Sequence, residues 1–184
     1  CISLAERPSR FGITVHNAGY RALDLDFLYK AIRPDDLNTA IAGIRGLGIR
    51  GCGVSMPYKI DALSLVDEVD AEAAAVGAIN TIVNDGGHLK GFNTDISGAR
   101  RALADIKLNS DDRVLLLGAG GVARAILHAL ASFPVADITV AARREEAVEN
   151  LRTGSSISWI PWEQRDSVES TVLINATPIG MAPD

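Results

Sequence analysis

The segment VLLLGAGGVARA, residues 114–125, constrains the fold more than any other part of the chain. A short apolar run, typical of a buried strand, leads into clustered glycines, and small and apolar residues then recur at helical spacing. Glycine permits positive φ and close approach of the backbone to an anion, and a helix that starts there directs free N–H groups at the same point. An ordinary strand–turn–helix is the alternative, but both flanks favour a dinucleotide-binding turn. Its candidate cofactor-binding residues are Gly118, Ala119, Gly120, Gly121 and Val122.

The choice of cofactor depends on the next predicted strand, residues 137–142, which is followed by Arg143 and Arg144. In a nucleotide-binding fold the end of this strand meets the adenosine ribose, where an acidic residue favours NAD and arginine accommodates the 2′-phosphate of NADP. Guanidinium groups form strong charge-assisted pairs with phosphate. The sequence therefore predicts NADP over NAD, with Arg143 as the contact. The alternatives are a solvated helix start and pairing of the arginines with Glu145 or Glu146.

Composition excludes several classes of protein. The chain has 184 residues, 47% of them hydrophobic, and a formal net charge of −5. This is enough apolar content for one or two domains, and the mild acidity argues against a nucleic-acid surface. No apolar stretch approaches the roughly 20 residues of a membrane span. Cys1 and Cys52 lack metal or thioredoxin-type spacing, which favours reduced thiols and a cytoplasmic protein. The histidines are scattered, so we expect no metal.

The first half of the chain alternates between strand and helix patterns. We expect strands over residues 1–4, 27–32 and 49–55, helices over 16–23 and 34–47, and a polar loop over 7–12. Asp35 and Asp36 suit the first turn of the second helix, and Gly48 suits its end. This order predicts parallel pairing in a βαβ unit. The sequence NDGG between residues 79–83 and 88–92 predicts a hairpin that ends the sheet with an antiparallel pair.

The second half has the pattern of a nucleotide-binding sheet. Two short helices over residues 60–66 and 71–76 are still expected in the first half. Beyond them we expect a helix over residues 96–106, a turn over 109–112, a helix opened by residues 143–146, and strands over 156–160 and 171–175. A strand this close to residue 184 leaves that sheet half-built, and no Met opens the sequence, so we expect a piece of a longer protein. The predicted fold is α/β, with a mostly parallel substrate-binding and catalytic domain over residues 1–95. A linker helix over 96–108 and a Rossmann-type NADP domain over 109–184, incomplete at its C-terminus, complete the predicted chain.

Lys59 and Asp95 are the candidate catalytic residues. Lys59 follows a predicted strand, in a loop at the carboxyl edge where open α/β sheets bind ligands. Asp95 closes the sequence Asn93-Thr94-Asp95 before a helix. The alternatives are ordinary ones, since lysine is usually a surface residue and aspartate is a common helix N-cap. Spacing alone does not decide between them.

Four motifs around the glycine turn carry a resemblance to a known family. They are GCGVSMPYK at residues 51–59, GAINT at 77–81, NTD at 93–95 and NATPIGM at 175–181. In this order, over nearly the whole chain, they resemble the shikimate dehydrogenase family. The resemblance implies an N-terminal substrate domain, a C-terminal NADP domain and an active site in the cleft between them. It also implies interconversion of 3-dehydroshikimate and shikimate, with quinate as a substrate of some members.

The resemblance also implies roles for single residues. Lys59 and Asp95 become the catalytic pair, Ser55 and Asn80 contact ring hydroxyls, and Thr177 and Met181 lie near the nicotinamide. Hydride transfer needs a group that moves the alcohol proton and stabilises developing charge on oxygen. A lysine amine does both when its surroundings favour the neutral form, and a nearby aspartate can orient it.

One loop departs from the family pattern. The family carries a Ser-x-Ser pair that holds the substrate carboxylate shortly before the motif matched by His16-Asn17, and here that pair is broken. Ser9, Thr14 or Arg10 could still meet a carboxylate, and Arg10 could equally face water. We expect a shikimate dehydrogenase-like branch acting on a small cyclic hydroxy acid. A homodimer is one assembly that the resemblance allows. The alternatives are a quinate or related hydroxy-acid dehydrogenase using NAD(P), and a non-catalytic NADP or metabolite sensor.

Overall fold

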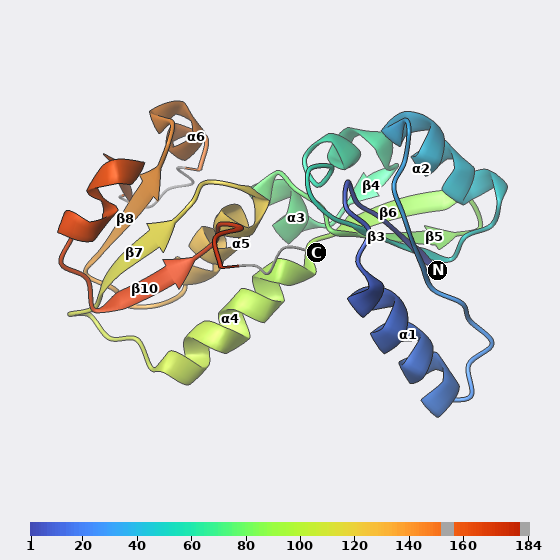
Figure 1. The fold of residues 1–184 in the computed structure, drawn as a ribbon, viewed down its shortest axis with the longest axis horizontal. Coiled ribbons are helices and arrows are strands. Elements are labelled where there is room, and N and C mark those ends of the chain that lie inside the picture. Colours follow the sequence, from blue (N-terminus) through green and yellow to red (C-terminus); the bar gives the residue numbers. More distant parts are fainter. Residues whose placement is uncertain (152–156, 181–184) are drawn as a thin grey trace. The chain divides into compact units, whose positions relative to one another are not determined.

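A computed structural model of residues 1–184 describes the chain except for residues 152–156 and 181–184 (Figure 1). The chain divides into two compact units, Cys1–Thr94 and Asp95–Asp184. Each unit is a mostly parallel sheet with helices, which confirms the predicted α/β class. Within the described residues, no helix is long and apolar enough to cross a membrane.

The first unit is built on a six-stranded sheet with the order β2-β1-β3-β5-β6-β4. Its strands are β1 (Ile2–Leu4), β2 (Lys30–Ile32), β3 (Gly51–Val54), β4 (Glu68–Val69), β5 (Thr81–Asp85) and β6 (His88–Phe92). Its helices are α1 (Arg10–Ala22), α2 (Leu37–Gly46), the 3₁₀ helix η1 (Asp61–Leu65) and α3 (Ala71–Val76). Strand β1 pairs in parallel with β2 and β3, as the alternation of strands and helices predicts.

Helix α2 follows its predicted signals. Asp36 is the N-cap, and its carboxylate accepts the backbone N–H of Thr39 at 3.4 Å. Gly48 has a φ of +62°, a conformation that glycine adopts without strain, just beyond the end of the helix. Ile41 and Ile44 are buried on the face that meets the sheet. This helix could be predicted from local sequence because it has an N-cap residue, a stripe of buried apolar residues and a glycine just after its last turn.

Helix α1 begins earlier than predicted. The expected loop over residues 7–12 is wrong beyond Ser9, which is the N-cap of a helix that already includes Arg10. The reason is that α1 buries none of its residues, and Phe11 is 77% exposed. Without a buried stripe, apolar periodicity does not mark where the helix starts. Strand β2 is also shorter than predicted, since it begins at Lys30.

The hairpin of β5 and β6 is confirmed, but it does not end the sheet. Gly86 and Gly87 have φ values of +59° and +96°, which suits the tight turn that joins two antiparallel strands. Outside this pair, β4 adds to β6 in parallel and forms the edge. Strand β4 has only two residues, too few for an alternating pattern to reveal.

The second unit has a parallel four-stranded sheet with the order β10-β7-β8-β9. Its strands are β7 (Arg113–Leu117), β8 (Asp137–Ala142), β9 (Ile157–Pro161) and β10 (Val172–Asn175). Its helices are α4 (Thr94–Ile106, whose first residue falls in the first unit), α5 (Gly121–Leu130), α6 (Glu145–Glu149) and the 3₁₀ helix η2 (Trp162–Ser167). The fourth strand lies beside the first, so the order matches the first four strands of a doubly wound nucleotide-binding sheet, 3-2-1-4.

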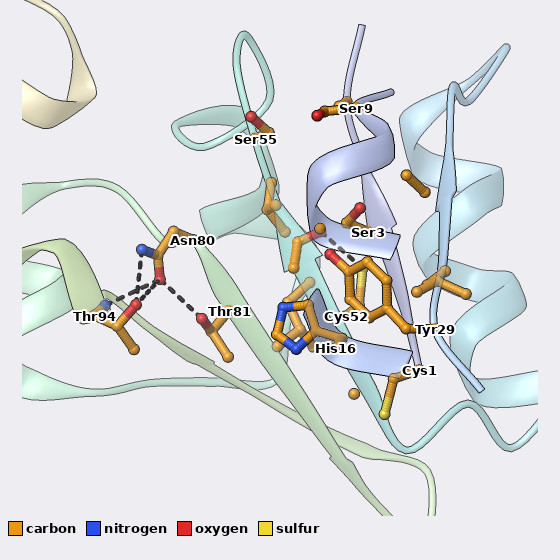
Figure 2. Close-up of a pocket in the computed structure, with 18 of the residues that line it drawn as sticks. Cys1, Ser3, Ser9, His16, Tyr29, Cys52, Ser55, Asn80, Thr81 and Thr94 are labelled. Atoms are coloured by element: carbon orange, nitrogen blue, oxygen red, sulfur yellow. Dashed lines mark hydrogen bonds between the residues drawn. The ribbon is translucent and has the colours of Figure 1, made fainter. Parts of the chain in front are cut away.

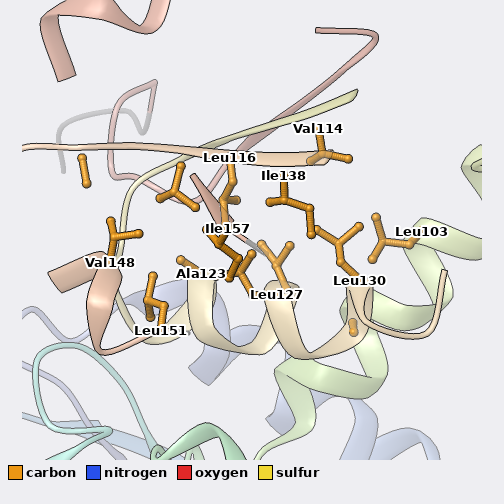
Figure 3. Packing of buried hydrophobic residues seen from close by; sticks show 14 of the residues in the cluster. Leu103, Val114, Leu116, Ala123, Leu127, Leu130, Ile138, Val148, Leu151 and Ile157 are labelled. Atoms are coloured by element: carbon orange, nitrogen blue, oxygen red, sulfur yellow. The ribbon is translucent and has the colours of Figure 1, made fainter. Parts of the chain in front are cut away.

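The core of this unit lies between the sheet and its helices. Ala123, Leu127 and Leu130 of α5 face the strand residues Leu116 and Ile138 (Figure 3). Leu130 is 1% exposed and Leu116 is fully buried. Helix α5 is therefore held by apolar packing along its length, and this packing fixes its first turn beside the end of β7.

Candidate functional site

Several polar residues of the first unit come together at one edge of the sheet because of its topology. Strands β1 and β3 are parallel neighbours, so the segments that follow them, with Ser9 and with Ser55 and Lys59, leave the sheet at the same edge. Strand β5 runs the opposite way, so its start, beside Asn80, lies at this edge too. Strand β6 is antiparallel to β5 and delivers Thr94 there.

A pocket of about 530 Å³ opens at this edge (Figure 2). Its polar lining residues are Cys1, Ser3, Arg7, Ser9, His16, Tyr20, Tyr29, Cys52, Ser55, Lys59, Asn80, Thr81 and Thr94. Among the residues that the structure describes, no aspartate or glutamate lines it. The His16 ring stacks on Tyr29, with centroids 4.3 Å apart. Burial raises the pKa of the Cys52 thiol to about 12, so this thiol contributes a neutral wall.

Asn80 makes several hydrogen bonds at the edge of this pocket (Figure 2). Its Oδ1 accepts the backbone N–H of Thr94 at 3.0 Å and the Thr81 hydroxyl at 2.9 Å. Its Nδ2 donates to Thr94 Oγ1 at 3.0 Å. The amide therefore joins the start of β5 to the residue just before Asp95. Lys59 is half-buried in the lining of the pocket, and Asp95 is the second residue of α4.

The loop after β1 brings Arg7 to the pocket and not Arg10, for which contact with a carboxylate and exposure to water were both open alternatives. Arg7 lines the pocket, whereas Arg10 and Thr14 are not among its lining residues. Thr14 Oγ1 donates to the Arg10 carbonyl within α1 at 3.0 Å. Sequence reasoning missed Arg7 because the family motif directed attention to the residues just before His16-Asn17, although Arg7 was correctly placed in a loop. The available signal was its position directly after a strand that ends at the ligand-binding edge.

The glycine turn of the second unit has the backbone predicted for it. Gly118 directly follows β7 and has a φ of +99°. A Cβ at this position would lie 2.9 Å from Thr177 Cγ2 and 3.0 Å from the Ala176 carbonyl oxygen. Glycine is therefore required both for the turn and for close packing against the segment that follows β10.

The start of α5 is open in the way an anion site requires. Gly120 is the N-cap of α5 and provides no side-chain cap for the first N–H groups of the helix. No described atom outside the neighbouring residues lies within 4 Å of a Cβ built on Gly120. The uncapped N–H groups and the positive end of the helix dipole favour a bound anion, and the open space leaves room for one.

The other predicted cofactor residues follow the neighbouring strands. Arg143 is exposed directly after β8, and Thr177 follows β10. The Asn175 carboxamide oxygen accepts both the backbone N–H and the hydroxyl of Thr177, at 2.9 and 2.6 Å. Because β7, β8 and β10 are parallel and adjacent, these residues share the carboxyl edge with Gly118. Met181 lies outside the described residues.

Known proteins resemble this chain along most of its length. Residues 11–82 match the family model of the shikimate dehydrogenase substrate binding domain. The shikimate dehydrogenase-like protein of Haemophilus influenzae is 38% identical over 181 residues, which are 98% of this chain and 66% of that relative. The shikimate dehydrogenase (NADP(+)) of Methanothermobacter thermautotrophicus is 38% identical over 92% of this chain and 63% of its own length. The chain thus spans somewhat less than two thirds of these curated relatives.

A solved structure agrees with this likeness. The crystal structure of shikimate 5-dehydrogenase from Listeria monocytogenes in complex with shikimate and NAD is 32% identical, with a TM-score of 0.79. The match covers 99% of this chain and 69% of that one. Sequence identity, coverage and backbone likeness therefore agree, and the chain belongs to the shikimate dehydrogenase family.

Proposed function

We propose that the protein is an NADP-dependent oxidoreductase that interconverts 3-dehydroshikimate and shikimate, or a close analogue, by hydride transfer. The observation in this chain that carries the proposal is the pocket of the first unit. Arg7 brings positive charge to it, Lys59 and hydroxyl and amide groups line it, and none of its described lining residues is acidic. Such a lining favours a ligand that is both anionic and hydroxylated.

The proposal assigns substrate contacts to three of the predicted residues that line the pocket. Ser55 and Asn80 donate to or accept from ring hydroxyls. Ser9 Oγ accepts the Phe11 N–H at 3.1 Å, which leaves its hydroxyl proton for a carboxylate. Thr14 stays a prediction without a place in the lining.

In the proposed reaction Lys59 and Asp95 are the catalytic residues. The Lys59 amine takes the proton from the substrate hydroxyl during oxidation and returns it during reduction. Its ammonium form also stabilises negative charge that develops on that oxygen. Asp95 orients the amine and the hydroxyl. The support is that Lys59 lines the pocket and that Asp95 directly follows Thr94, which also lines it.

The second unit supports the cofactor assignment. The uncapped start of α5 and the open space at Gly120 fit a pyrophosphate, and Arg143 after β8 fits the 2′-phosphate of NADP. Thr177, held by Asn175, is assigned to the nicotinamide end together with Met181. When bound, the oxidised cofactor NADP⁺ would accept the hydride during alcohol oxidation, and NADPH would supply it during the reverse reduction. One observation keeps NAD as a second candidate, since the related Listeria enzyme was crystallised with shikimate and NAD.

The proposal also includes a cytoplasmic location and a homodimeric assembly. The two cysteines are free in the structure, one of them buried, which suits a reducing compartment such as the cytoplasm. A homodimer is the proposed assembly, and size-exclusion chromatography with light scattering tests it.

A spectrophotometric screen of the complete protein tests the function. The absorbance of NADPH and of NADH is followed with 3-dehydroshikimate and 3-dehydroquinate, and the reverse reaction with shikimate and quinate. The proposal expects the fastest turnover with the shikimate pair and NADP(H). Absence of turnover with every pair would favour a non-catalytic sensor.

A further inference from the structure

We infer that Arg7 recognises the carboxylate of the substrate and makes the pocket selective for anionic over neutral ring compounds, an inference that rests on the proposed function. The geometry of the loop is the first support. The backbone on the N-terminal side of Arg7 is fixed by two hydrogen bonds, from Ala5 N–H to the Ile32 carbonyl at 3.0 Å and from Glu6 N–H to the Met56 carbonyl at 3.2 Å. Arg7 therefore extends from a defined point at the ligand-binding edge.

The charge of Arg7 is available to a ligand. Its neighbour Glu6 is engaged elsewhere, because one carboxylate oxygen lies 2.9 Å from Arg33 Nη2 and the other accepts the Tyr58 hydroxyl at 3.0 Å. Desolvation and the hydrogen bond to Glu6 both raise the pKa of Tyr58, so the hydroxyl keeps the proton that it donates. Arg7 forms no ion pair with any residue in the described part of the chain.

Two features of the pocket lining favour a carboxylate ligand: its described residues include no acidic side chain, and Ser9 provides a second hydrogen-bond donor. None of the described lining residues is acidic, so a carboxylate from a ligand is the natural partner for the Arg7 guanidinium. The guanidinium can bind both carboxylate oxygens with a planar pair of N–H groups. Ser9, two residues further along, presents a hydroxyl in the same loop. Figure 2 shows this hydroxyl near one end of the pocket, with Ser55 at the same end.

Arg10 differs from Arg7 in its position relative to the pocket. Arg10 is also exposed and cationic, but it is the first residue of α1 and does not line the pocket. Arg10 therefore provides a matched control of the same type, charge and exposure, three residues away in the sequence. A general effect of positive charge would be shared by both arginines, whereas direct recognition belongs to Arg7 alone.

The test is a binding measurement with the complete protein. Calorimetric dissociation constants for shikimate and for its methyl ester, which lacks the negative charge, are compared between wild type, Arg7→Met, Arg7→Lys and Arg10→Met. Loss of a charge-assisted contact predicts about a 10- to 100-fold weaker affinity of Arg7→Met for shikimate. Its affinity for the ester should stay at the wild-type value. Arg7→Lys should recover part of the loss, and Arg10→Met should bind both ligands as wild type does.

Binding and turnover separate the two proposals. Wild-type affinity of Arg7→Met for shikimate, or equal losses for shikimate and its ester, would overturn the role of Arg7. So would a wild-type protein that binds the ester as tightly as the acid, or that binds neither. If Arg7→Met fails to fold, the ratio of the two dissociation constants in Arg7→Lys decides. Turnover of 3-dehydroshikimate by the wild type is scored independently, and its absence alongside Arg7-dependent binding would contradict only the proposed reaction.

Discussion

Asn80 and Thr94 are joined by hydrogen bonds in both directions. Asn80 Nδ2 donates to Thr94 Oγ1 and Asn80 Oδ1 accepts the Thr94 N–H, each at 3.0 Å. Because Thr94 is the first residue of α4, the amide fixes the backbone immediately before Asp95. Asn80 is thus placed to hold a proposed catalytic residue in position as well as to contact substrate.

Replacing Asn80 by alanine should weaken both stability and turnover. Loss of these hydrogen bonds predicts a decrease of about 1–2 kcal/mol in the free energy of unfolding, measured by urea denaturation. Misplacement of Asp95 and loss of a substrate contact predict about a 10- to 100-fold lower kcat/KM. Asn38→Ala, at an exposed position of α2, is the control and should change neither. Wild-type kinetics in Asn80→Ala would remove Asn80 from the proposed site.

Gly118→Ala should disrupt the turn that follows β7. The positive φ and a Cβ 2.9 Å from Thr177 Cγ2 predict a loss of about 1–3 kcal/mol of stability, together with loss of NADPH binding measured by fluorescence. Gly98→Ala is the matched control in the same unit, because Gly98 lies within α4 and an added Cβ meets nothing within 4 Å. It should raise stability by about 0.5–1 kcal/mol. Equal effects of the two substitutions would contradict the close packing at Gly118.

Arg143→Ala should alter the preference between the two nicotinamide cofactors. Loss of a charge-assisted contact to the 2′-phosphate predicts about a 10- to 100-fold higher KM for NADPH, whereas the KM for NADH stays unchanged. Arg101→Ala, at an exposed position of α4, controls for the loss of one positive charge. An equal rise in KM for NADPH and for NADH would show that Arg143 does not bind the 2′-phosphate.

The structural elements that could be predicted from sequence are those with local sequence signals. The strand, glycine turn and helix around Gly118 could be predicted because the apolar run, the glycines and the helical spacing lie within twelve consecutive residues. The turn at Gly86 and Gly87 could be predicted for the same reason. Such signals depend on backbone conformation and on neighbours along the chain, and tertiary packing did not override them.

The elements that sequence reasoning misplaced lack a local signal. Helix α1 has no buried face, so apolar periodicity does not mark the residue at which it begins. Strand β4 has two residues and forms by pairing with β6, which is distant in the sequence. The position of Arg7 at the pocket, with Glu6 held by Arg33 and Tyr58, joins residues that are up to 52 positions apart. No local pattern encodes that arrangement.

Asp67 should make the stability of the protein depend on pH in the acid range. Hydrogen bonds from Arg45 and from the Leu89 N–H lower the pKa of Asp67 from its ordinary value of 3.8 to about 2. A carboxyl whose pKa is lower in the folded state stabilises the fold above pH 4, and this stabilisation is lost as the pH falls from about 4 to 2. Urea denaturation at several pH values should therefore show a decline over this range in the wild type.

Two variants separate Asp67 from other acidic groups. Asp67→Asn should be less stable at neutral pH and should show a shallower decline between pH 4 and 2, since the titrating carboxyl is gone. Arg45→Met removes the main partner and should act in the same direction. A decline in both variants as steep as in the wild type would show that the pairing of Arg45 with Asp67 contributes little.

The most direct test of the proposed reaction is the turnover of Lys59→Ala with shikimate and NADP in the complete protein. Lys30→Ala, at an exposed position of β2, is the control. We expect Lys59→Ala to lower kcat by about 10²- to 10⁴-fold, because proton transfer to and from the substrate hydroxyl is lost, while NADPH binding keeps its wild-type affinity. Turnover at the wild-type rate in Lys59→Ala would contradict the proposed catalytic role of Lys59 in the pocket.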